Sequence, residues 1–79
     1  MAEERSGFAE AAQRAADRLA VALEAAGFDV GKAFPSLRSG WDGSGAPGVQ
    51  LGSVTCAVAL DLATLLISAV DAGVTFPSR

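Results

Sequence analysis

The sequence predicts a small α+β domain in which two helices pack with a short β-hairpin, in the order αββα. Two long segments with helical spacing of apolar residues, 3–26 and 53–72, enclose a glycine-rich stretch, 34–52, in which apolar residues alternate. Residues 73–79 follow as a short tail. We expect a single domain over residues 1–79, because 79 residues are close to the lower limit for one hydrophobic core.

The first predicted helix, residues 3–26, has an inward face made mostly of alanine. At helical spacing, eight residues fall on this face: Phe8, Ala11, Ala12, Ala15, Leu19, Ala22, Leu23 and Ala26. Gly27 is placed to end the helix. A stripe so rich in alanine permits close approach to a neighbour, but it removes little apolar area from water per residue.

The middle segment predicts a β-hairpin with strands near 36–41 and 48–52, joined by a turn dense in glycine. Alternation along the two strands leads us to expect four inward side chains: Leu37, Trp41, Val49 and Leu51. An irregular connecting loop over 34–52 is the alternative, and the chain would then be an all-α helical hairpin.

The segment 53–72 is the most hydrophobic part of the chain and predicts the second helix. We expect Ser53 to cap its N-terminus and Gly73 its C-terminus. Its polar residues form one narrow stripe: Asp61, Thr64, Ser68 and Asp71. The first helix and the hairpin are expected to cover most of the remaining apolar circumference, and a second copy or a partner protein the rest.

Six large apolar side chains are therefore candidate partner contacts. Five belong to the 53–72 helix and the sixth is the single tryptophan: Leu60, Leu62, Leu66, Ile67, Val70 and Trp41. Tryptophan is enriched at binding hot spots, but in so small a domain we expect Trp41 chiefly to cap the packed helices. The resulting hypothesis is a non-catalytic interaction module that forms a homodimer or binds another protein through the second helix.

The composition argues against catalytic, metal and nucleic-acid functions. With no histidine and one cysteine, the chain lacks the usual zinc ligand sets and any histidine-activated nucleophile. Asp61 and Asp71 are about 15 Å apart along a helix, too far to share a proton or a metal. A net charge of −3 disfavours phosphate backbones. We predict no enzyme activity, cofactor or small-molecule ligand, and expect Cys56 to be a buried, inert thiol.

The glycines between the strands spell G-x-G-x-x-G over residues 43–48. A dinucleotide site requires a preceding strand and a following helix N-terminus that directs amide groups at the pyrophosphate. Here a strand is expected to follow, and Pro47 has no amide hydrogen. We therefore interpret residues 43–48 as a turn and not as a dinucleotide-binding loop.

Two alternative functions use the same second helix. A small membrane-associated protein would insert it, but Asp61 near its centre costs about 2.5–3.5 kcal/mol on insertion scales, and Arg79 is the only cation after Arg38. A non-catalytic subunit of a larger enzyme or regulatory complex would dock it. The acidic N-terminal residues do not resemble a secretory signal, so we expect a cytoplasmic protein, and its arginine and alanine usage is typical of bacteria.

Overall fold

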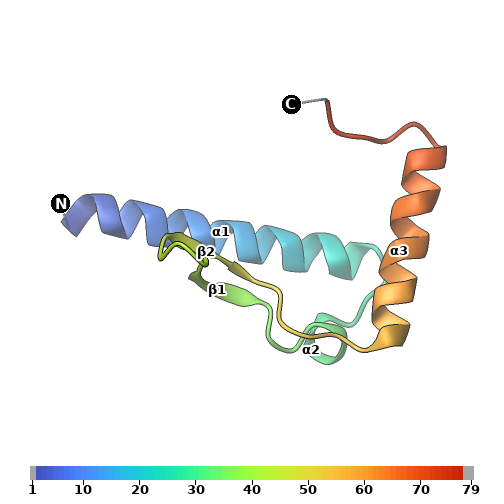
Figure 1. Cartoon of the computed structure of the whole chain (residues 1–79), viewed down its shortest axis with the longest axis horizontal. Coiled ribbons are helices and arrows are strands. Elements are labelled where there is room, and N and C mark those ends of the chain that lie inside the picture. Colours follow the sequence, from blue (N-terminus) through green and yellow to red (C-terminus); the bar gives the residue numbers. More distant parts are fainter. Residues whose placement is uncertain (1, 78–79) are drawn as a thin grey trace.

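The computed structural model describes residues 2–77, with side chains from Ala9 to Pro77. The elements follow in the order α1 (Ala2–Ala25), α2 (Val30–Ala33), β1 (Arg38–Trp41), β2 (Pro47–Gln50) and α3 (Cys56–Asp71). The predicted αββα order is confirmed, with α2 as an added helical turn before the hairpin (Figure 1). The all-α alternative is wrong, because the two strands pair.

Both long helices end at glycine, as the sequence predicts. Gly27 and Gly73 have φ values of 106° and 86°, a region that glycine adopts without a Cβ penalty. After α1, the N–H of Phe28 donates to the carbonyl of Leu23, and the N–H of Gly27 to that of Glu24. The same two bonds close the end of α3, so carbonyls that a helix end leaves free are satisfied.

The start of α3 differs from the prediction. Ser53 is not the cap; Thr55 is, and its hydroxyl accepts a hydrogen bond from the N–H of Val58 at 3.1 Å. Either residue type can cap a helix, and the backbone around Gly52 decides between them: with φ of 71°, Gly52 still belongs to the connector from the hairpin.

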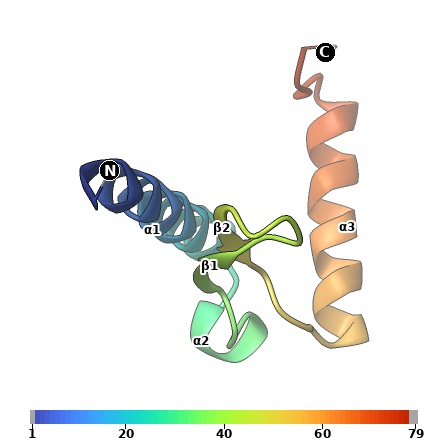
Figure 2. The same cartoon turned by 60° about the vertical axis from the view of Figure 1, so that its left-hand side comes forward.

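The hairpin lies along α1. Its strands are antiparallel, with the register running from Arg38 opposite Gln50 to Trp41 opposite Pro47. The hydroxyl of Ser39 donates to Oε1 of Gln13 on α1 at 2.9 Å. The hairpin therefore occupies the packing face of α1 (Figures 1 and 2).

The core lies between α1, the hairpin and the segment that joins them. Among the described side chains, four hydrophobic ones are buried: Ala12, Ala16, Leu23 and Phe34. Phe34 meets Phe28 edge to face, with ring centroids 5.4 Å apart. Of the side chains described from Ala9 to Pro77, two large ones, Leu23 and Phe34, are buried in this core, which is little for a domain of this length.

The buried face of α1 is rotated from the predicted one. Ala12 and Leu23 are buried as expected, and Leu19 is half-buried, but Ala16 joins them while four predicted members are exposed: Ala11, Ala15, Ala22 and Ala26. Phe8 lies outside the described side chains. The rotation follows from the neighbour, because α1 packs on the hairpin and not on α3.

Two of the four predicted inward side chains of the hairpin are exposed. Trp41 is 67% exposed and Leu51 53% exposed, whereas Leu37 and Val49 are half-buried. Trp41 lies opposite Ala9 and Ala12 of α1, and alanine side chains are too short to cover an indole. The expectation that Trp41 caps the core is wrong.

The chain is extended for its size. The described structure measures 44 × 32 × 22 Å, with a radius of gyration of 14.6 Å, against about 11.6 Å for a compact domain of this length. The reason is visible in Figures 1 and 2, where α3 stands at the C-terminal end of α1, apart from the hairpin. The helix pair that was expected to share one core does not form.

The connector between β2 and α3 depends on a close approach at Gly52. Its φ of 71° is strained for any other residue, and a Cβ there would overlap the side chain of Ser36. Gly45 in the hairpin turn has a similar φ of 84°, but a Cβ on it would meet nothing within 4 Å. Substitutions at these two glycines therefore distinguish the cost of backbone strain from the cost of steric overlap.

We predict that Gly52→Ala destabilises the fold more than Gly45→Ala. The Gly45 variant carries only the left-handed backbone penalty, about 1–2 kcal/mol, whereas the Gly52 variant adds the overlap with Ser36. Urea denaturation followed by circular dichroism measures both. Equal losses of unfolding free energy would mean that Ser36 moves aside at little cost.

Candidate docking surface on the C-terminal helix

No side chain of α3 is buried. The large apolar residues on the side facing away from α1 are the most open, with Leu60 68%, Ile67 61% and Leu66 57% exposed. We define this side as the outward face. It spans about 120° of the helix circumference at helical spacing and consists of Cys56, Ala59, Leu60, Ala63, Leu66, Ile67 and Val70.

The polar stripe of α3 is turned toward α1. Asp61, Thr64 and Ser68 line a hollow of about 380 Å³ together with the segment 26–28, at the end of α1. A helix on the surface of a folded domain normally turns its apolar face to the core and its polar face to water. In this chain the arrangement is reversed, so α3 presents its most hydrophobic surface to the outside.

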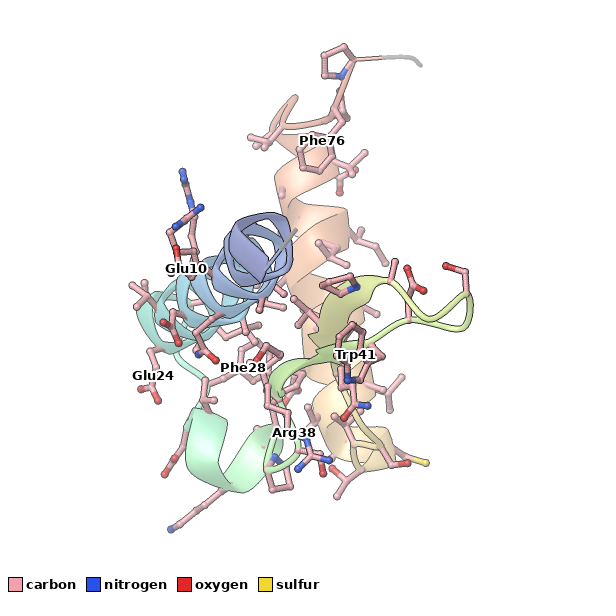
Figure 3. All side chains as sticks on the ribbon, turned by 90° about the vertical axis from the view of Figure 1, so that its left-hand side faces the viewer. Glu10, Glu24, Phe28, Arg38, Trp41 and Phe76 are labelled. Atoms are coloured by element: carbon pink, nitrogen blue, oxygen red, sulfur yellow. The ribbon has the colours of Figure 1, made fainter. Side chains whose placement is uncertain are left out.

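The tail extends the outward face. Val74 and Phe76 line an apolar hollow of about 320 Å³ with residues of the last two turns of α3: Leu66, Ala69 and Val70. Phe76 is 86% exposed at its rim (Figure 3). Neither tail residue was among the candidate contacts, although the spacing of Leu66, Val70 and Val74 continues the helical periodicity and signals the extension.

The structure brings together five of the six predicted contact residues, all on α3. Four of them are exposed, and Leu62 is half-buried. Trp41 is separate, because it lines a hollow with residues of α1 and the hairpin: Ala9, Ala12, Ser39, Gly40 and Pro47. Cys56 is exposed, so the expectation of a buried thiol is wrong.

The described residues offer little for chemistry. Among the side chains that the structure describes, from Ala9 to Pro77, there is no group of three histidine, cysteine, aspartate or glutamate residues that could hold a metal ion. Over residues 2–77, no helix combines the length and apolar character needed to cross a membrane. The hollow beside the polar stripe contains one titratable side chain, Asp61, which gives no acid–base pair.

Comparisons with protein-family models, curated proteins and solved structures found no match to this chain. Its function is therefore inferred from the surface that it presents.

The turn next to Trp41 is held by one carboxylate. Oδ1 of Asp42 accepts hydrogen bonds from the Ser44 hydroxyl at 2.6 Å, the Ser44 N–H at 2.8 Å and the Ala46 N–H at 3.0 Å. These donors, the Ser44 hydroxyl first, hold the pKa of Asp42 below its ordinary value of 3.8. The turn is thus a built structure rather than a free glycine loop, and it fixes the end of β1 where Trp41 lies.

We predict that acid opens this turn. Because the pKa of Asp42 is lowered in the folded chain, its carboxylate stabilises the turn above pH 3.8, and this contribution is lost as the pH falls through the lower folded value. The fluorescence of Trp41, the only tryptophan, should report the change. Asp42→Ala should show the acid spectrum already at neutral pH, whereas Asp71→Asn, on α3, should keep the native transition. A native acid transition in the Asp42 variant would contradict this assignment.

Proposed function

We propose that this protein is a non-catalytic interaction module that self-associates through the outward face of α3. The observation that carries the proposal is the reversed orientation of this helix, whose apolar side faces away from its own chain. The arginine and alanine usage favours a bacterial source, and a cytoplasmic location is part of this proposal.

The exposed area supports a protein partner. The chain has an accessible surface of 6236 Å², whereas a folded monomer of 7.9 kDa exposes about 4,400 Å². The excess, roughly 1,800 Å², exceeds the about 800 Å² that each partner buries in a standard interface. A chain that exposes this much more surface than a folded monomer of its mass resembles one subunit of an assembly.

The stability of α3 supports the same conclusion. Its 16 residues are barely longer than the roughly 12–15 residues below which an isolated helix is marginal in water. Helices in proteins draw most of their stability from packing of an apolar face, and α3 buries no residue within its own chain. A second copy supplies that packing without any further component.

We predict that the native chain sediments as a dimer, with twice the mass of 7.9 kDa, and that Leu66→Asp converts it to a monomer. A new uncompensated charge within the contact costs about 3 kcal/mol or more, which weakens association more than ~100-fold. Leu66 is exposed in the single chain, so its replacement should leave α1 and the hairpin folded, as circular dichroism and Trp41 fluorescence can verify.

The matched control is Asp61→Asn on the polar stripe of the same helix, which should keep the dimer mass. A native chain of monomer mass at micromolar concentration would refute self-association. A dimer that survives Leu66→Asp would move the contact away from the outward face. Flotation of the monomer with lipid vesicles would favour the membrane-associated alternative, and co-purification only with a larger enzyme would favour the accessory-subunit alternative.

A further inference from the structure

We infer that two copies of α3 pair antiparallel, about a two-fold axis that passes beside Ala63. This inference rests on the proposed self-association and adds the orientation and register of the pair.

The outward face has the repeat that packs two helices side by side. Cys56, Ala63 and Val70 are seven residues apart, and so are Leu60, Ile67 and Val74. A seven-residue repeat keeps one seam of a helix facing its neighbour at a crossing angle of about 20°. The small side chain of Ala63 lies midway between Cys56 and Val70, so the closest approach of two such helices falls at the centre of the seam.

The two flanks of this seam differ, and the difference decides the orientation. Ala59 and Leu66, which are exposed, complete the seam beside Cys56, Ala63 and Val70. Beyond the seam, Leu60 and Ile67 on one flank are exposed, whereas Leu62 and Ala69 on the other are half-buried in the single chain. A two-fold axis perpendicular to the helices places like flanks together, so Leu60 meets Ile67 of the second copy. A two-fold axis parallel to the helices would place each exposed flank against the half-buried flank of the second copy. Only in the antiparallel pair does the exposed flank of one copy cover the exposed flank of the other.

The charges favour the same orientation. The first turn of α3 has no acidic residue and its last turn has no basic one, so neither end of the helix dipole is compensated within the helix. With the axis beside Ala63, Asp71 of one copy lies level with Thr55, the N-cap of the other copy. Each carboxylate is then level with the positive end of the neighbouring helix, whereas a parallel pair would bring the two negative helix ends together with no basic residue in either last turn.

Disulfide trapping tests the inference with residues that the chain supplies. In the antiparallel pair the two Cys56 residues are about 21 Å apart along the axis, far beyond the roughly 7 Å between Cα atoms that a disulfide spans. In a parallel pair they would lie face to face. The double variant Cys56→Ser/Ala63→Cys instead places both thiols beside the two-fold axis. Ala63 is exposed in the single chain, so this small change should leave the fold intact.

Both proteins are oxidised with copper phenanthroline at a concentration where sedimentation gives the dimer mass. We expect the double variant to be trapped as a disulfide-linked dimer and the native chain to remain uncross-linked. Trapping of the native chain through Cys56 would overturn the antiparallel orientation but leave self-association standing. A dimer that neither thiol traps would overturn the register, and a monomer mass would remove the proposed function itself.

Discussion

The narrow alanine stripe of α1 has room for one neighbouring element, and the β-hairpin occupies it. Ala12 and Ala16 let the strands approach closely, and Ser39 is bonded to Gln13 across the contact. With the hairpin on this face, the apolar side chains that α1 leaves exposed are chiefly alanines, such as Ala11, Ala15 and Ala22, which offer α3 little area to bury. The extended shape, the exposed tryptophan and the uncovered final helix all follow from this limit on what one small-residue face can cover.

The local signals in the sequence were sufficient for the elements and insufficient for their packing. Glycine at the helix ends, the hydrophobic periodicity and the turn residues of the hairpin predicted α1, the two strands and α3 close to their observed bounds, because each acts over a few residues. The cap of α3 was misplaced by two residues, since Ser53 and Thr55 are equivalent by type. Their difference lies in the geometry of Gly52 beside Ser36, which involves residues 16 positions apart.

The choice of neighbours could not be predicted for a related reason. Periodicity identifies the apolar side of α1 and of α3 but does not say whether those sides meet each other or the hairpin. The sequence therefore indicated correctly that α3 lacks cover, and wrongly that Trp41 and Leu51 would provide some of it. The orientation of α3, with Asp61 turned toward α1, became evident only in three dimensions.

The uncovered face of α3 also links the fate of the protein to its abundance. Association by mass action makes stability depend on protomer concentration, and a solitary copy displays Leu60, Leu66 and Ile67 in the manner of a partly unfolded chain. Surfaces of that kind are continuously sorted by chaperones and proteases. For the proposed dimer, clearance would depend on concentration: copies below the concentration at which they pair stay open to proteolysis, whereas paired copies are protected.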